Sequence, residues 1–167
     1  MKTLLKNLFG KKEKVIDIVA PMTGKIVKIE NVPDQVFNQK MIGDGLAIEP
    51  TEGTVVAPFD GEVVQLFPTK HAIGIRDKNG IEVLIHIGME TVALNGDGFE
   101  SYVKQGDQVK LGQKLIAFNI GWIKDKAESL ISPVVITNLD KVESFMKSEE
   151  DTVTGGESVL LSVKTVG

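Results

Sequence analysis

The chain contains two histidines, His71 and His86, and no cysteine. The absence of cysteine excludes disulfides, thiolate nucleophiles and zinc–cysteine sites. The serines stand in no GxSxG context, so a Ser–His–Asp arrangement cannot be argued. A neutral imidazole near pH 7 can act as a base, a metal ligand or a nucleophile. The chemistry open to this chain therefore depends on whether the fold brings its two histidines together.

The segment between the histidines predicts a β-hairpin. Asn79-Gly80 is the strongest short signal for a two-residue turn, because both residue types tolerate a positive φ. Runs rich in apolar and β-branched residues flank this dipeptide on both sides, as expected for paired strands. With Asn79-Gly80 as the complete loop, Lys78 would pair with Ile81.

That register would place both histidines on one face of the hairpin. His71 would face Gly88 and His86 would face Ile73, which makes the two histidines diagonal neighbours with backbones roughly 7–8 Å apart. A slip of one residue would put them on opposite faces, because side chains alternate along a strand. The register is therefore a geometric prediction that a structure can test.

The alternation of residue types after the turn predicts which face is buried. Val83, Ile85 and Ile87 form an apolar face, which we assign to the core. His86 lies on the opposite face beside Leu84. It should point away from the core, toward a partly exposed environment.

Three interpretations of the histidine pair remain open at this point. Both could be surface side chains without a chemical role. They could be two ligands of a metal site with Asp34 or Glu90 as the third, although no HxH or HExxH spacing supports this. Alternatively, one imidazole could accept a group on Nε2 while the other donates a hydrogen bond to it. Convergence suits this last interpretation best, and phosphoryl transfer fits it because a phosphohistidine stays labile.

The whole chain has the properties of one soluble globular domain. Its 167 residues suffice for a proper core, and 42% hydrophobic with 25% charged residues is ordinary for such proteins. A net charge of −4 argues against nucleic acid as a partner. No apolar run is long enough to span a membrane, and no signal-peptide core is present, so we expect a cytoplasmic protein.

From residue 15 onward the sequence predicts an all-β fold. Glycine and proline punctuate short β-like segments, as in sandwiches and barrels. The motif APxxG followed by an alternating strand occurs at Ala20 and again at Ala57, 37 residues later, which suggests two similar halves. We expect few helices. The candidates are residues 33–40, a single turn at 99–103, 122–130 and 139–147.

Residues 1–14 differ from the rest and form a separate N-terminal segment before a domain of residues 15–167. Four apolar residues fall on one side of a helix and five lysines supply positive charge: Leu4, Leu5, Leu8 and Phe9, with Lys2, Lys6, Lys11, Lys12 and Lys14. Such a basic amphipathic segment can lie on an anionic membrane surface. A flexible, solvated tail is the alternative.

Taken together, the motifs resemble the enzyme IIA proteins of the glucose family, from the bacterial phosphoenolpyruvate-dependent sugar phosphotransferase system. The resemblance covers the chain from about Ile16 to the last strand, with the motifs in the same order and spacing. They are VAPMTGKIV at 19–27, VPDQVF at 32–37, GDGLAI at 43–48, VAPFDG at 56–61, TKHA at 69–72, VLIHIGMETV at 83–92 and SPVVI at 132–136.

The resemblance implies a fold and a mechanism. The fold would be an antiparallel β-sandwich of the barrel-sandwich type with a few short surface helices. His86 would take a phosphoryl group on Nε2 from phospho-HPr and pass it to a cysteine on the IIB domain of a sugar permease. His71 would hold the phosphate and be oriented by the Thr69 hydroxyl, while the Gly88 carbonyl would accept the Nδ1 proton of His86. No cofactor is implied, apart from adventitious or regulatory zinc at His71 and His86.

The resemblance also implies a surface for partners. An apolar ring would dock them and exclude water: Val36, Phe37, Ile42, Phe67, Leu84 and Val92. Asp34 and Glu90 would meet basic residues on HPr. Departures from the family pattern, such as Glu90 in place of aspartate and Leu84 in place of an aromatic, concern partner preference. Regulated transporters or sugar kinases are further implied partners, residues 1–14 would correspond to a membrane-associating tail, and we expect a monomer.

Two other function classes remain open. A zinc hydrolase on a related β architecture would need a third metal ligand and an activated water. A non-catalytic binding module would recognise partners according to phosphorylation state. A biotin or lipoyl carrier is excluded, because the modified lysine expected in a tight turn is missing from the chain.

Overall fold

The computed structural model describes residues 14–166, which are mostly β-strand. The strands are β1 (Val15–Val19), β2 (Gly24–Lys28), β3 (Asp44–Pro50), β4 (Thr54–Val56), β5 (Gly61–Leu66), β6 (Ala72–Asp77), β7 (Glu82–His86), β8 (Phe99–Ser101), β9 (Gln108–Val109), β10 (Lys114–Phe118), β11 (Ser132–Ile136), β12 (Val142–Lys147), β13 (Thr152–Val153) and β14 (Val159–Thr165). The helical elements are α2 (Gln35–Asn38), α3 (Ile120–Lys126) and the short 3₁₀ turns η1 (Ile29–Asn31), η2 (Thr91–Leu94) and η3 (Leu139–Lys141).

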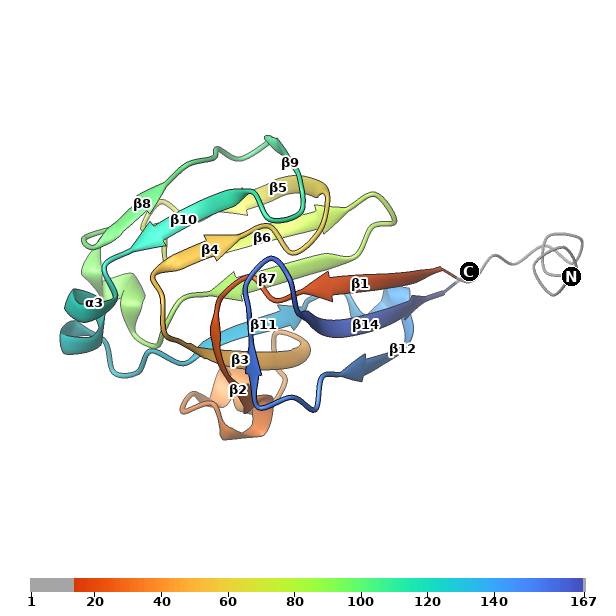
Figure 1. Ribbon diagram of the computed structural model, residues 1–167, viewed down its shortest axis with the longest axis horizontal. Coiled ribbons are helices and arrows are strands. Elements are labelled where there is room, and N and C mark those ends of the chain that lie inside the picture. The colour runs from red at the N-terminus through yellow and green to blue at the C-terminus, as the bar shows by residue number, and fades with distance from the viewer. Residues whose placement is uncertain (1–13, 167) are drawn as a thin grey trace, which may run out of the picture.

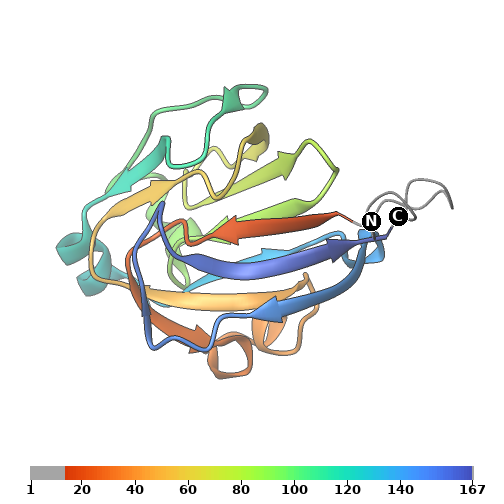
Figure 2. The same cartoon turned by 45° about the vertical axis from the view of Figure 1, so that its right-hand side comes forward.

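The strands form three antiparallel sheets. The largest has the order β13-β2-β3-β11-β7-β6-β5-β9, and two three-stranded sheets have the orders β1-β14-β12 and β4-β10-β8. Figures 1 and 2 show β1 and β14 crossing in front of β7 and β11, so the short sheets lie over the large one. The predicted antiparallel β-sandwich with a few short helices is confirmed.

The core lies between these layers and fixes the orientation of the hairpin β6–β7. Val83, Ile85 and Ile87 are all buried in the main apolar cluster, together with Ile73 and Ile75 of β6. The predicted core face is therefore correct. Because side chains alternate along a strand, the other face of β7 carries Leu84 and His86 away from this cluster.

The predicted hairpin register is wrong by one residue. Ile73 pairs with Ile85, and His86 pairs with Ala72. The loop has three residues, 78–80, because the Gly80 N–H donates to the Asp77 carbonyl at 3.0 Å. Gly80 has φ = +91°, which is the glycine position of a three-residue hairpin loop.

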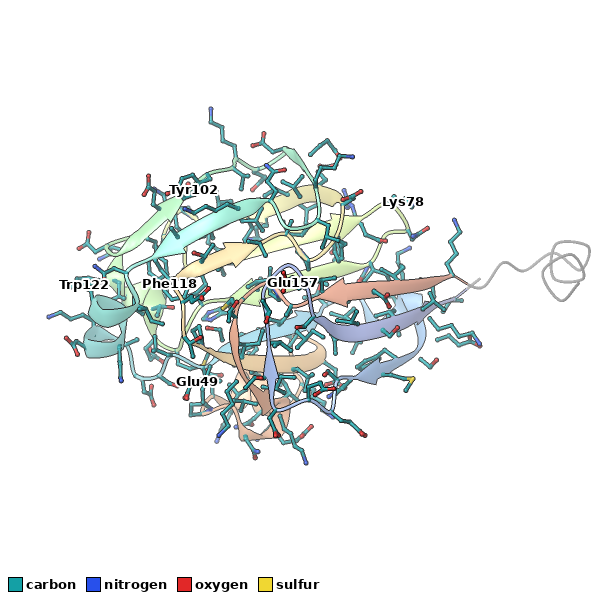
Figure 3. All side chains as sticks on the ribbon, in the orientation of Figure 1. Glu49, Lys78, Tyr102, Phe118, Trp122 and Glu157 are labelled. Atoms are coloured by element: carbon teal, nitrogen blue, oxygen red, sulfur yellow. The ribbon has the colours of Figure 1, made fainter. Side chains whose placement is uncertain are left out.

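A buried carboxylate explains the longer loop. Asp77 accepts hydrogen bonds from the backbone N–H groups of Asn79 (3.0 Å) and Ile81 (2.9 Å) and from the Asn79 amide (3.1 Å). In a three-residue loop these backbone N–H groups have no partner on the opposite strand, and the Asp77 carboxylate supplies the missing acceptor. Figure 3 shows Lys78, at the tip of this loop, at the end of the molecule opposite Trp122 of α3.

The predictions for helices were only partly correct. A short helix at 33–40 is confirmed as α2, where the Asp34 carboxylate accepts from Val36 N at 2.8 Å and caps the helix. The helix at 122–130 is α3, which begins earlier and ends at Lys126. Residues 139–147 are wrong as a helix, since η3 is followed by β12, which pairs with β14. Residues 99–103 are also wrong as a turn of helix, since β8 pairs with β10.

The predicted segment 1–14 lies outside the described residues, apart from Lys14. Among the described residues, 14–166, no helix combines the length and apolar character needed to cross a bilayer.

The role of Asp77 in the loop gives a stability prediction. Asp77→Ala would leave buried backbone N–H groups without an acceptor and should lower the free energy of unfolding by about 1–3 kcal/mol. Lys78→Ala, in the same loop with an exposed side chain, should change it by less than about 0.5 kcal/mol. Urea denaturation of the three proteins measures this difference. Equal stabilities for the two variants would show that Asp77 does not determine the loop.

Candidate active site

His86 is the last residue of β7 and points to the face opposite the main core. Its Nδ1 lies 2.8 Å from the Gly88 carbonyl oxygen. Since a carbonyl can only accept, this hydrogen bond requires a proton on Nδ1. In the neutral ring the other nitrogen, Nε2, then carries the free lone pair. The Nδ1 hydrogen bond therefore selects the tautomer that has its free lone pair on Nε2.

His71 reaches the same place from the other strand. It directly precedes β6 and follows Lys70, which has a left-handed φ of +59°. The two imidazole rings lie 5.0 Å apart between centroids and are nearly perpendicular, at 81°. The predicted convergence is confirmed although the register is not. Side chains alternate between the two faces only within a regular strand. His71 precedes the first residue of β6 and follows the turn at Lys70, so this alternation does not apply to it.

Hydrogen bonds on both sides hold His71 in place. The Thr69 hydroxyl bonds its Nδ1. Its backbone carbonyl accepts from Ile87 N at 2.7 Å, which ties it to the residue after His86. The His71 side chain is only 4% exposed, so it forms the floor of the site rather than its rim.

Burial lowers the pKa of both histidines. For His71 burial is the larger cause and the neighbouring His86 adds to it, so that the pKa falls to about 4. For His86 burial also lowers the pKa, opposed by the hydrogen bond to Gly88 and by the negative charges of Asp34 and Glu90. Both rings are therefore neutral at pH 7.

Aromatic rings form the walls of the site. Phe37 of α2 lies 5.1 Å from the His86 ring, and Phe67 lies 5.3 Å from the His71 ring. Phe37 is buried in a second, smaller apolar cluster, against which Leu84 packs. Of the predicted ring residues, Phe37 and Phe67 thus lie beside the histidines, and Leu84 packs against the cluster that contains Phe37.

Other predicted partner residues form an exposed rim. Val36 and Ile42 flank Phe37 in sequence and are exposed, as is Val92 in η2. Sequence reasoning missed Met41, which is 69% exposed and whose N–H bonds the Val36 carbonyl at 3.0 Å. Its position in the sequence, between the predicted helix at 33–40 and the predicted partner residue Ile42, could have indicated that Met41 belongs to the same exposed apolar surface.

Asp34 and Glu90 contribute negative charge at this rim. The charges of both carboxylates raise the pKa of His86, against the larger effect of burial. Among residues 14–166, however, no group of three or more His, Asp or Glu side chains is arranged to hold a metal ion. The metal-site interpretation thus lacks its third ligand in the part of the chain that the structure describes.

Sequence reasoning also missed polar groups behind Gly88. The Ser132 hydroxyl accepts from Gly88 N at 2.9 Å, and the Thr91 hydroxyl donates to the Ile87 carbonyl at 2.6 Å. Both side chains are fully buried. A lone serine at the start of an apolar strand, as in SPVVI, is the signal that could have identified Ser132.

Comparison with known proteins agrees with this geometry. Residues 16–142 match the family described as phosphoenolpyruvate-dependent sugar phosphotransferase system, EIIA 1. The chain belongs to this EIIA family. The resemblance drawn from the sequence motifs is therefore confirmed.

Individual EIIA relatives are similar over nearly their full length. A glucose-specific EIIA component from Bacillus anthracis is 53% identical over 96% of this chain and 98% of its own. One from Staphylococcus aureus is 50% identical with the same coverage. The solved structure of glucose permease IIA from Mycoplasma capricolum has a TM-score of 0.84 and 39% identity, and the match covers 89% of this chain and 96% of that one.

The low pKa of His71 predicts how the stability of this EIIA domain depends on pH. As pH falls below 6.5 the unfolded chain binds a proton at this position before the folded one does, so stability present above pH 6.5 is lost toward pH 4. A pKa difference of one corresponds to about 1.4 kcal/mol, so the fall from 6.5 to about 4 corresponds to about 3.5 kcal/mol in total, of which about 3 kcal/mol is lost between pH 6.5 and 4.

The comparison of wild type with His71→Gln isolates this contribution. Between pH 6.5 and 4 the wild type should lose more unfolding free energy than the variant, by about 3 kcal/mol at most, because glutamine does not titrate. Denaturation at closely spaced pH values measures it. Parallel pH profiles would contradict a depressed pKa at His71.

Proposed function

We propose that this EIIA chain is a phosphocarrier. His86 accepts a phosphoryl group from phospho-HPr and passes it to a cysteine on the IIB domain of a glucose-type sugar permease, which couples sugar uptake to phosphorylation. The observation that carries the proposal is the Nδ1 hydrogen bond of His86 to the Gly88 carbonyl, which leaves Nε2 free beside His71. The names of the relatives support glucose as the sugar class.

Each transfer exchanges one phosphorus bond for another. The Nε2 lone pair of His86 attacks phosphorus, the bond from phosphorus to the HPr imidazole breaks, and that imidazole keeps the electron pair. In the second transfer a cysteine thiolate attacks, and His86 leaves as a neutral imidazole. While phosphorylated, the His86 ring is positively polarised, and the Gly88 carbonyl stabilises it through Nδ1–H.

His71 supplies a donor to the transferred group. A Thr69 hydroxyl that donates to Nδ1 leaves the proton of neutral His71 on Nε2. This N–H can bond a phosphoryl oxygen on His86. In phosphoryl transfer, positioning and charge stabilisation account for most of the catalysis.

The surroundings suit a group that must pass between proteins without reaching water. Phe37 and Phe67 cover the sides of the two rings, and a docked partner would close the exposed front. The acidic Asp34 and Glu90 would attract basic residues of HPr.

We expect a cytoplasmic monomer with no cofactor. Adventitious zinc could bind the two imidazoles and block Nε2 of His86, so phosphorylation assays should include a chelator.

Phosphorylation of His86 is the central prediction. After incubation with phosphoenolpyruvate, enzyme I and HPr, the wild type should gain one acid-labile phosphate and His86→Ala none. His71→Ala should accept phosphate but pass it to a IIB domain about 100- to 1,000-fold more slowly, because it lacks one donor to the phosphoryl oxygens. Intact mass, phosphorus NMR and quenched-flow transfer measure these outcomes. A wild type that takes up no phosphate would overturn the proposal.

The exposed rim gives a separate prediction. Met41→Lys would place a positive charge where an apolar contact and a basic HPr surface are expected, and should raise KM for phospho-HPr about 10-fold. Met146→Lys is the matched control, since Met146 is 76% exposed on β12. Equal KM values for the two variants would place the docking surface elsewhere.

A further inference from the structure

The two peptide units that follow Ile87 are each held by the segment Ser129–Ser132. Gly88 N donates to the Ser132 hydroxyl at 2.9 Å, and Met89 N donates to the Ser129 carbonyl at 2.9 Å. The second peptide unit is the one whose carbonyl, on Gly88, accepts the Nδ1 proton of His86. The position of this acceptor therefore depends on groups more than 40 residues away in sequence.

Two side chains hold the first of these units, Thr91 through the Ile87 carbonyl and Ser132 through Gly88 N, and Ser132 is fully used. Its hydroxyl accepts from Gly88 and donates to the Leu130 carbonyl at 2.8 Å. Its side chain is 0% exposed, so water cannot replace it freely. A buried N–H that loses its only acceptor destabilises the native orientation of its peptide unit and so favours rotation of that unit about Gly88.

The conformation of Gly88 makes that rotation consequential. Gly88 has φ = +67°, and a Cβ there would lie 2.9 Å from the Ser129 carbonyl oxygen and 3.0 Å from the Thr91 methyl group. Glycine is thus required by backbone and by space. Glycine also moves between conformations readily, so the native orientation of its carbonyl has to be held by its neighbours.

We propose that Ser132 is a positioning residue that helps to set the tautomer of His86 by holding Gly88 N, on the peptide unit just before the one whose carbonyl accepts from His86. It touches neither the phosphoryl group nor the imidazole and acts through the Gly88 carbonyl. Its effect on transfer rests on the proposed function, whereas its effect on the tautomer does not.

The test is Ser132→Ala, with the tautomers of His86 read from the ¹⁵N shifts of its ring nitrogens. In the wild type at pH 8 the Nδ1–H tautomer should dominate. In the variant the ratio of Nδ1–H to Nε2–H should fall about 3- to 10-fold, the value of one neutral hydrogen bond. The rate of phosphorylation by phospho-HPr should fall only as far as the fraction of molecules in the Nδ1–H tautomer falls, because only that tautomer has a nucleophilic Nε2.

Two further variants keep the test decisive. Ser158→Ala removes another serine hydroxyl that accepts a backbone N–H, from Thr154 at 2.8 Å, and should leave the His86 tautomers unchanged. Ser132→Cys retains most of the side-chain volume but has only a weak acceptor, so it should also lower the ratio of Nδ1–H to Nε2–H. It replaces Ser132→Ala in the test if the alanine variant does not fold. An unchanged tautomer ratio in a folded Ser132 variant would overturn the inference. A shifted ratio with no phosphate on the wild type would overturn the proposed function alone.

Discussion

The hydrogen bond from His86 Nδ1 to the Gly88 carbonyl is the interaction on which the site depends. A neutral imidazole has two tautomers of similar free energy, and only one exposes a lone pair on Nε2. The acceptor at 2.8 Å removes this ambiguity before any partner arrives. The fold serves this bond in two ways: the core side of β7 fixes the strand, and the strand β11 with the segment before it fixes the loop that carries the acceptor.

Burial imposes an opposing constraint on the same pair. Two imidazoles with centroids 5.0 Å apart would repel each other if both were charged, and burial makes either charge costly. The lowered pKa values of His71 and His86 are the result. At His86 the negative charges of Asp34 and Glu90 oppose this lowering of the pKa.

The sequence predicted the elements whose signals are local. The alternation at 83–87, the short helix within 33–40 and the turn at Asn79-Gly80 could be predicted directly from the sequence. The same Asn-Gly signal fits both a two- and a three-residue loop, and the buried Asp77 carboxylate decides between them. Leu139, Val142 and Met146 have helical spacing, yet β12 forms because β14 offers it an unpaired edge. Ser132 was missed because its role also depends on a contact that is distant in sequence, the hydrogen bond from Gly88 N.

Each histidine takes the hydrogen bond that orients its ring from a residue only two positions away, Thr69 for His71 and Gly88 for His86. The residues that orient the two rings thus lie in two tripeptides, Thr69-Lys70-His71 before β6 and His86-Ile87-Gly88 at the end of β7. Sequence change outside these tripeptides and the supporting segment Ser129–Ser132 can alter stability or surface charge while each ring keeps the hydrogen bond that orients it. The orientation of the two rings can therefore persist through sequence divergence of the surrounding surface.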